Sequence, residues 1–323
     1  MLSYADFKEK QIVICFSTNK QKISFLNDNL IIKDEEDTII LQSSCYKIFS
    51  LWIIGSVTLT SGILERSKKF AFPVSLFTYS FRCYGTWSSS TEGNYLLRQK
   101  QYENRSRNIA RLIIINKIAN QLGLIKNLRN KNPVQLRAID LLCNYKMQIS
   151  EAKSIQEIMG IEGIASKVYF EAWFYDLNWK GRKPRAKRDM LNTLMDIGYT
   201  FLFNIVEAML NLYGFDLYVG NLHQCFYQRK SLVCDLVEPF RCIIDNQLKK
   251  AFHLNQIKVD DFKEIKGQFI LSYEKSKEYT KWLLAALLEK KESIFYYTQE
   301  YYRWFMKEKS DAEFPNFNLF HNE

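Results

Sequence analysis

The feature that most constrains this chain is a change of hydrophobic pattern near residue 88. Before that point the sequence consists of short runs rich in β-branched and aromatic residues, which are typical of strands. These runs cover residues 11–17, 22–25, 29–33, 38–42, 51–57, 72–78 and 81–85. Between two of them, Thr60 or Ser61 is placed to cap a short helix over residues 60–66. Residues 1–88 are therefore predicted to form a small β-rich domain.

After residue 88 the apolar residues recur at helical spacing. A polar stretch at residues 89–94 predicts a linker. Helices are predicted over residues 96–121, 133–145, 151–157, 163–176, 189–213, 231–250, 259–271 and 276–308. Pro239 lies within one of them, and because it removes a backbone hydrogen bond we expect a kink just after Glu238. The predicted fold class is α+β, with a β-rich domain at 1–88 followed by a larger all-α domain at 95–323.

The net charge of the chain indicates which class of binding partner it favours. With 45 Lys and Arg against 35 Asp and Glu the net charge is +10, which favours polyanions, nucleic acid first. The apolar stretch at 48–57 is shorter than the roughly 20 residues that cross a bilayer, and the N-terminus lacks a secretory signal. The 7 cysteines are scattered without a C-x-x-C spacing, which favours reduced thiols and a cytoplasmic location.

Histidine is scarce, and His223 is the most informative one. It lies in a glycine-containing segment, 219–223, between two predicted helices. Asp235 and Glu238 follow, and because residues i and i+3 share a helix face, both carboxylates are expected to point back toward His223. A single histidine beside an apolar run is also typical of a structural residue, so that alternative stays open.

A second acid, Glu162, stands between Gly160 and Gly163 just before a predicted helix. It is either a functional carboxylate with small neighbours or an acid that stabilises a helix N-terminus. Two carboxylates and an imidazole without thiolates suit Mg²⁺ or Mn²⁺ and phosphoryl chemistry. Arg241 and Asp245, four residues apart, are expected to form a structural ion pair.

A basic run lies between the two acidic segments. Its charge fits either a solvated loop or a surface that binds a phosphate backbone. On the second interpretation, the expected DNA contacts are Lys180, Arg182, Lys183, Arg185, Lys187 and Arg188, together with Arg98 on the first helix of the all-α part.

Taken in order, several segments form one pattern. They are 159–170 (MGIEGIASKVYF), 182–184 (RKP), 189–200 (DMLNTLMDIGYT), 214–216 (GFD), 220–223 (GNLH) and 231–245 (SLVCDLVEPFRCIID). In this order and spacing the chain resembles the CRISPR-associated adaptation integrases, the universal Cas-one family. The likeness covers nearly the whole chain.

The resemblance implies a set of site residues and partners. Glu162, His223 and Glu238 would bind Mg²⁺ or Mn²⁺, and Asp235 would complete the catalytic group. Asn192 and Tyr199 match supporting positions beside the cleft. The resemblance also implies a homodimer, with the N-terminal domain in dimerisation or partner contact, and a small Cas-two partner that bridges two dimers. The DNA partners would be double-stranded fragments and the CRISPR repeat.

The function expected from the resemblance is a metal-dependent DNA integrase and endonuclease. It would insert short foreign DNA into a CRISPR array by attack of a 3′-hydroxyl on a repeat phosphodiester. Two other classes remain open. In a non-catalytic, basic nucleic-acid-binding scaffold the acids would only cap helices, and DNA binding would survive Glu162→Ala. A basic membrane-surface protein has support only from the aromatic C-terminal helix.

Overall fold

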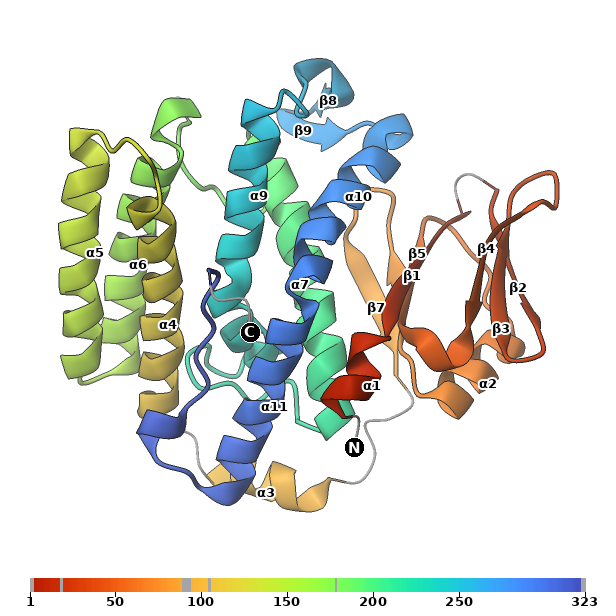
Figure 1. Ribbon diagram of the computed structural model, residues 1–323, viewed down its shortest axis with the longest axis horizontal. Coiled ribbons are helices and arrows are strands. Elements are labelled where there is room, and N and C mark those ends of the chain that lie inside the picture. The colour runs from red at the N-terminus through yellow and green to blue at the C-terminus, as the bar shows by residue number, and fades with distance from the viewer. Residues whose placement is uncertain (1–2, 18–19, 89–93, 104–105, 178, 321–323) are drawn as a thin grey trace. The chain divides into compact units, whose positions relative to one another are not determined.

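The structure is a computed structural model that describes residues 3–17, 20–88, 94–103, 106–177 and 179–320. The chain divides into two compact units (Figure 1). One comprises Met1–Tyr95 with Glu207–Phe215, and the other comprises Leu96–Val206 with Asp216–Glu323. The predicted linker at 89–94 lies, apart from Asn94, outside the described residues.

The N-terminal unit confirms the strands predicted from the β-branched runs, since each run overlaps one strand. A four-stranded sheet has the order β1-β5-β6-β7, and a three-stranded antiparallel sheet has the order β2-β3-β4. The elements are α1 (Tyr4–Lys8), β1 (Gln11–Phe16), β2 (Lys22–Leu26), β3 (Asn29–Lys33), β4 (Ile39–Ser44), η2 (Cys45–Lys47), β5 (Ile48–Ile54), α2 (Ser61–Phe70), β6 (Val74–Phe77) and β7 (Cys83–Trp87).

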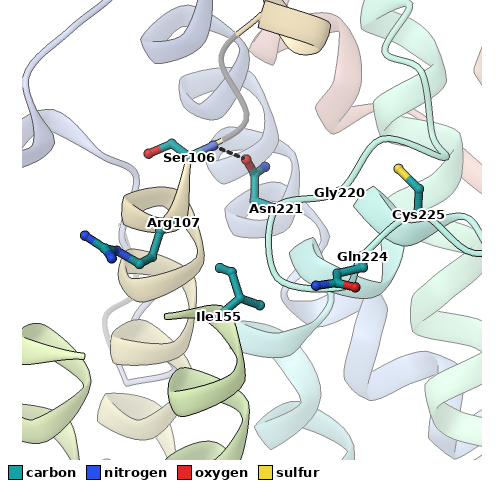
Figure 2. Close-up of a pocket in the computed structure, with 7 residues that line it drawn as sticks. All are labelled: Ser106, Arg107, Ile155, Gly220, Asn221, Gln224 and Cys225. Atoms are coloured by element: carbon teal, nitrogen blue, oxygen red, sulfur yellow. Dashed lines mark hydrogen bonds between the residues drawn. The ribbon is translucent and has the colours of Figure 1, made fainter. Parts of the chain in front are cut away.

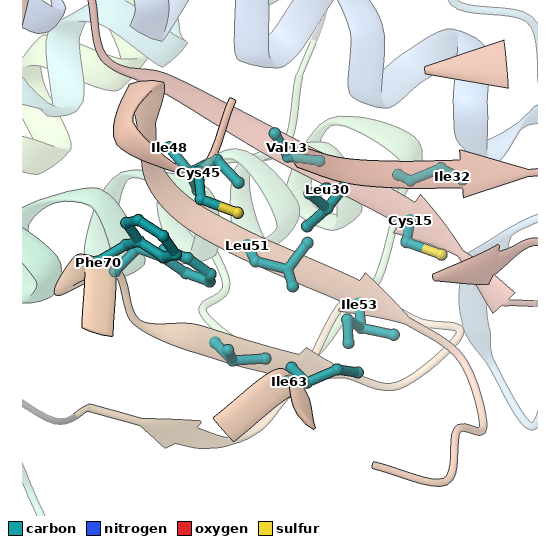
Figure 3. Packing of buried hydrophobic residues seen from close by; sticks show 12 residues of the cluster. Val13, Cys15, Leu30, Ile32, Cys45, Ile48, Leu51, Ile53, Ile63 and Phe70 are labelled. Carbon is teal, nitrogen blue, oxygen red and sulfur yellow. The ribbon is translucent and has the colours of Figure 1, made fainter. Parts of the chain in front are cut away.

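Strand β5 is the centre of this unit. It pairs in parallel with both β1 and β6, and all of its residues are buried. Parallel neighbours need a crossover connection, which α2 provides between β5 and β6. Figure 3 shows alternate residues such as Val13, Leu51 and Ile53 packed with Leu30 of β3 and Ile63 of α2. Alternation along a strand directs every second side chain to one face, so the two sheets and α2 share this core.

The C-terminal unit is mainly helical. Its elements are α3 (Tyr95–Glu103), α4 (Arg107–Lys126), α5 (Pro133–Glu151), α6 (Ile155–Trp173), η3 (Tyr175–Leu177), α7 (Met190–Tyr213), α8 (Ser231–Leu236), η4 (Glu238–Phe240), α9 (Arg241–His253), η5 (Val259–Asp261), β8 (Phe262–Ile265), β9 (Gln268–Leu271), α10 (Tyr273–Glu289), α11 (Lys291–Lys307) and η6 (Asp311–Glu313). The last residues of α7, from Glu207, are assigned to the N-terminal unit.

Helix α4 is the central element of the C-terminal unit. It contacts α5, α6, α8, η4 and α9, and the first two lie beside it in Figure 1. A helix surrounded in this way must bury its polar side chains against partners. Asn116 donates to the carbonyl of Phe317 at 2.7 Å and accepts from its N–H at 3.0 Å, while Asn120 accepts from the N–H of Leu319 at 2.9 Å. The C-terminal segment is thereby held against α4.

The prediction of a helix over 259–271 is wrong, and the larger domain is therefore not purely helical. Strands β8 and β9 form an antiparallel hairpin there. Lys266 and Gly267, the two residues between them, both have positive φ angles of 52° and 72°. Two consecutive left-handed residues are the geometry of a tight two-residue hairpin turn. The α+β fold class itself is confirmed.

Other boundaries follow local chemistry. Helix α6 starts at Ile155, with the Ser154 hydroxyl accepting from the Glu157 N–H at 3.1 Å, and it continues through both glycines around Glu162. The expectation that Glu162 precedes a helix is therefore wrong. The kink expected at Pro239 is confirmed, because α8 gives way to η4 and then to α9. The long helix predicted over 276–308 is two helices that meet at Lys290.

Among the described residues, α7 alone is long and apolar enough to cross a membrane by length and composition. Of its most apolar window, however, 78% is buried inside the protein, as in the core helix of a globular fold. No disulfide bond joins cysteines within the described part of the chain.

Candidate functional site

Two of the predicted acids converge on one buried lysine. Glu162 of α6 contacts the Lys117 ammonium through Oε1, and Glu238 of η4 lies 2.7 Å from the same Nζ through Oε2. Lys117 comes from the middle of α4, so the contact joins three elements. Arg241, at the start of α9, holds the other oxygen of Glu238 at 2.9 Å, and Ser166 donates to Glu162 at 2.7 Å.

These charges are stable at neutral pH because they compensate one another. Burial would raise the pKa of Glu238, but the charges of Arg241 and Lys117 outweigh it and lower this pKa from 4.5 to about 2. Burial would also lower the pKa of Lys117, but Glu162 and Glu238 more than compensate and raise it above 10.5. Two carboxylates and two cations leave this cluster with no net charge.

One carboxylate oxygen of the cluster has an ion-pair partner but no hydrogen bond. Glu238 Oε2 is buried and accepts no hydrogen bond, although the Lys117 ammonium is within ion-pair distance. The contact between Lys117 and Glu238 is thus an ion pair whose geometry is not that of a hydrogen bond. A buried carboxylate oxygen in this condition retains a lone pair that a further cation or donor would satisfy.

His223 is held in place by Asp235, another of the predicted acids. The fully buried Asp235 carboxylate contacts the His223 ring at Nδ1 (2.7 Å) and accepts from its backbone N–H (2.9 Å). It also accepts from the N–H groups of Asn221 (2.6 Å) and Leu222 (3.0 Å). With Nδ1 directed at a carboxylate, Nε2 is the ring nitrogen left for a metal or a proton.

Gly220 is required for this wrapping. A Cβ atom at Gly220 would lie 2.8 Å from atoms of Ser231 and 2.9 Å from Asp235 Oδ2, closer than real Cβ contacts. Only glycine lets the loop approach α8 this tightly. Of the two acids predicted to point toward His223, only Asp235 contacts its ring, although the charge of His223 also contributes to the lowered pKa of Glu238. Asp235 contacts the histidine segment, whereas Glu238 lies beyond the end of α8 and contacts Lys117 and Arg241.

A divalent ion would find suitable donors here but an occupied position. Glu162, Glu238 and His223 offer two carboxylates and an imidazole, a donor set that suits Mg²⁺ or Mn²⁺. The Lys117 ammonium, however, lies between the carboxylates, and the described residues contain no group of three His, Cys, Asp or Glu side chains arranged to hold a metal. The donor types thus suit a divalent metal, while the Lys117 ammonium occupies the position between the two carboxylates.

The supporting residues Tyr199 and Asn192 have separate tasks. The Arg241 guanidinium lies 4.7 Å from the centre of the Tyr199 ring, whose hydroxyl donates to Asp245. Tyr169 donates to the other oxygen of Asp245 at 3.0 Å. The predicted Arg241–Asp245 ion pair is therefore wrong, because Arg241 pairs with Glu238. Tyr199 thus packs against the Arg241 guanidinium, and it affects the site by positioning the cation that pairs with Glu238.

Asn192 organises the start of the basic run. Its side-chain oxygen accepts from the Lys183 N–H at 2.7 Å and from Arg182 at 3.1 Å. Arg182 is half-buried and forms an ion pair with Asp196 at 2.6 Å, so its charge is already used within the protein. The other cations of the run form no ion pair with described residues; they are Lys180, Lys183, Arg185, Lys187 and Arg188.

Arg98, the remaining predicted DNA contact, lies on α3, away from the basic run in sequence. It acts electrostatically on the Tyr102 phenol, which donates to Asp216 at 2.8 Å. The structure does not bring Arg98 into the Lys117 cluster by any described contact.

An open pocket adjoins the histidine segment. It has a volume of about 450 Å³ and is lined by Ser106, Arg107, Ile155, Gly220, Asn221, Gln224 and Cys225. Figure 2 shows Asn221 in its wall, accepting from the Ser106 N–H at 3.1 Å. This bond ties the His223 loop to the start of α4, the helix that carries Lys117.

The sequence reasoning missed Lys117 and the true partner of Arg241. The signal for Lys117 was a lysine inside an apolar helix, between Ile114 and Ile118, both of which are buried. A cation in such a position needs buried carboxylates, because an unpaired buried charge is strongly unfavourable.

Comparison with known proteins identifies the family. The family model described as CRISPR associated protein Cas1 matches residues 14–283. A protein of Thermodesulfovibrio yellowstonii named CRISPR-associated endonuclease Cas1 1 is 31% identical over 218 residues, 62% of this chain and 69% of that protein. The chain therefore belongs to the CRISPR-associated Cas1 family, whose named members are endonucleases.

Two solved structures have the same fold. One, titled Cas6-RT-Cas1--Cas2 complex, matches with a TM-score of 0.82 at 22% identity, covering 97% of this chain and 36% of that chain. The other, a casposase bound to integration product, matches with a TM-score of 0.78 at 20% identity, covering 97% of this chain and 96% of that chain.

The burial of Asp245 beside Tyr199 and Tyr169 predicts that the free energy of unfolding depends on pH. Burial raises the pKa of Asp245 from 3.8 to about 6, although hydrogen bonds from Tyr199 and Tyr169 oppose the rise. Because the folded chain holds this proton more tightly than the unfolded chain, the wild type loses stability as pH rises through that interval. The side chain of Asp245→Asn cannot ionise, so the variant does not lose this stability. The free energy of unfolding of the variant minus that of the wild type should therefore rise by up to about 3 kcal/mol between about pH 4 and pH 7.

Urea unfolding at a series of pH values measures this difference. Asp140→Asn, at an exposed carboxylate on α5, is the matched control. A constant difference between Asp245→Asn and the wild type across the whole range would contradict the prediction.

Proposed function

We propose that this chain is a divalent-metal-dependent DNA integrase and endonuclease of CRISPR adaptation. The observation that supports this most is the convergence of Glu162 and Glu238 on a single cation position, in the same unit as a histidine oriented by Asp235. Membership of the Cas1 family and the fold shared with a casposase bound to integration product agree with it.

In this proposal Glu162, Glu238 and His223 would hold Mg²⁺ or Mn²⁺, with His223 binding through Nε2. A bound divalent ion stabilises charge on phosphoryl oxygens and helps to activate a hydroxyl. Asp235 keeps the imidazole in position, and Arg241 keeps Glu238 ionised. Because the cluster is neutral, withdrawal of the Lys117 ammonium leaves it with one net negative charge, since Arg241 stays paired with Glu238.

The reaction is a transesterification. The 3′-oxygen of a DNA fragment forms a bond to a repeat phosphorus, and the bond from that phosphorus to the leaving 3′-oxygen breaks. The attacking hydroxyl loses a proton and the leaving oxygen gains one, so no covalent enzyme intermediate is required. With water in place of the hydroxyl, the same site would hydrolyse DNA. Exposed cations of the basic run, such as Lys183 and Arg185, would bind the phosphate backbone.

The proposed partners follow from the same family. They are double-stranded DNA, a second copy of this chain and a small Cas2 partner, since one structural relative is a complex with Cas2. The proposed location is the cytoplasm of a prokaryotic cell. A second candidate is a non-catalytic DNA-binding scaffold, which the occupation of the cation position by Lys117 favours.

The direct test is strand transfer of a labelled duplex into a supercoiled plasmid that carries the CRISPR repeat, with Mn²⁺ or EDTA. Glu162→Gln and His223→Ala each remove a proposed metal ligand, so product should fall by about a hundredfold or more while DNA binding is retained. Glu171→Gln, at an exposed carboxylate of the same helix, should keep wild-type activity.

Two results would contradict the proposal. Product that survives both ligand substitutions would place the chemistry elsewhere. DNA binding without product under any metal or partner condition would favour the scaffold.

Lys117 gives a separate test that does not depend on turnover. Lys117→Met removes the competing cation, so Mn²⁺ affinity should rise by about tenfold or more, measured from the electron paramagnetic resonance signal of free Mn²⁺. Without metal, the same variant should lose on the order of 3 kcal/mol of stability, since two buried carboxylates lose their shared partner.

Two further variants control for charge and position. Lys117→Arg keeps the cation and should keep the low affinity, and Lys126→Met alters an exposed lysine of the same helix. Equal Mn²⁺ affinity in Lys117→Met and wild type would show that the ammonium does not compete.

A further inference from the structure

The last described residues of the chain, 314–320, form a strap along α4, which we call the C-terminal strap. Figure 1 shows this segment beside that helix. Burial alternates along it, since Phe317 and Leu319 are buried whereas Asn316 and Asn318 are exposed. Such alternation is typical of an extended chain that packs one face against a neighbouring element.

Two buried asparagines of α4 hold the strap by its backbone. Asn116 accepts from the Phe317 N–H at 3.0 Å and donates to the Phe317 carbonyl at 2.7 Å. Asn120, one turn further along, donates to the same carbonyl at 2.9 Å and accepts from the Leu319 N–H at 2.9 Å. Because both amides are buried, their polar groups need these partners. The strap is therefore fixed in one register on α4, with Phe317 opposite Asn116.

The side chain of Phe317 reaches a second element. Its ring lies 4.8 Å from the Phe240 ring, centre to centre, in an edge-to-face arrangement. Phe240 is fully buried and is the last residue of η4, the turn that begins with Glu238. Asn116 is the immediate neighbour of Lys117 on α4. Phe317 thus contacts both the helix that carries the Lys117 ammonium and the turn that carries its Glu238 partner.

The position of η4 depends on this packing. It is a single 3-10 turn of three residues with Pro239 in the middle and no side-chain cap. Short 3-10 turns have poorer hydrogen-bond geometry than α-helices, so neighbouring side chains decide where they lie. Glu238 and Phe240 belong to the same turn. Loss of the Phe317 ring would leave a cavity beside Phe240, and η4 would shift into it and carry Glu238 away from its present position.

We propose that Phe317 is a positioning residue for the candidate site. By packing between α4 and η4, it fixes the Glu238 carboxylate at the position where it meets Glu162 across one cation. The inference rests on the proposed metal-dependent function. It goes beyond that function because it assigns a role in the metal site to the C-terminal strap, which lies outside residues 14–283 that the family model matches.

The test measures Mn²⁺ affinity of the full chain without DNA, from the electron paramagnetic resonance signal of free Mn²⁺. Phe317→Ala removes the contact with Phe240, so Glu238 is no longer held, and the Kd for Mn²⁺ should rise by about tenfold or more, as for other groups that orient metal ligands. Phe317→Leu keeps part of the apolar packing and should raise the Kd by only about threefold.

Leu319→Ala is the matched control. Leu319 is a buried residue of the same strap, so its truncation should lower the melting temperature as Phe317→Ala does. It leaves the contact between Phe317 and Phe240 in place, and the Kd for Mn²⁺ should stay within about twofold of the wild type. Affinities are compared at a temperature at which thermal melts show every variant to be folded. A purely structural role of the strap would change both variants alike.

A second comparison covers a failure of Phe317→Ala to fold. Phe317→Leu is then measured against Leu319→Val, and a rise in Kd of about threefold for the first with none for the second is expected. Phe240→Leu alters the same ring contact from the η4 side and should weaken Mn²⁺ binding in the same way as Phe317→Leu.

Each alternative result is distinct. An unchanged Kd in Phe317→Ala, or equal weakening in Phe317→Ala and Leu319→Ala, would overturn this inference and leave the proposed function intact. Tighter Mn²⁺ binding in Phe317→Ala would show that the strap opposes the metal, and would also overturn the inference. A wild type that binds no Mn²⁺ would contradict the proposed function, and this inference with it.

Discussion

A single buried ammonium group determines how the C-terminal unit is assembled. Lys117 is almost completely enclosed on the central helix α4, and its charge requires both Glu162 of α6 and Glu238 of η4. Removing a cation from water is costly unless carboxylates compensate it, so these three elements must meet at one point. The same requirement brings together two acids that are far apart in sequence, which is the arrangement that a cation-dependent phosphoryl site needs.

The surrounding residues give this point its geometry. Pro239 ends the α8 helix, so that Asp235 and Glu238 face different partners although they are three residues apart. Asp235 then organises the His223 segment through four contacts, and Gly220 allows the close approach. Helix α4 would be expected to bury only apolar side chains, yet its polar residues contact the site on one side and the C-terminal segment on another. Helix α4 thus holds both the candidate site and the C-terminal segment in place.

The local pattern was enough to predict the strands and most helices, because β-branched runs and helical periodicity act over short distances. The hairpin of β8 and β9 was not predicted, because Lys266 and Gly267 form its turn through backbone angles that the hydrophobic pattern does not reveal. Local patterns indicate Glu162, His223 and Glu238 as candidates with structural alternatives, and the resemblance assigns these three residues to a metal site. Lys117 was missed because burial of a charge depends on tertiary partners, and Arg241 was assigned to Asp245 because the i,i+4 rule ignores the tyrosines that bind that acid.

We infer that the Lys117 ammonium and a divalent ion use the same position between Glu162 and Glu238. The most direct measurement is an anomalous difference map from crystals of the protein soaked in Mn²⁺. We expect a manganese peak bonded to both carboxylates and to His223, with the Lys117 ammonium displaced from its present contacts. A map in which Lys117 still bridges the two carboxylates, with no manganese between them, would contradict it.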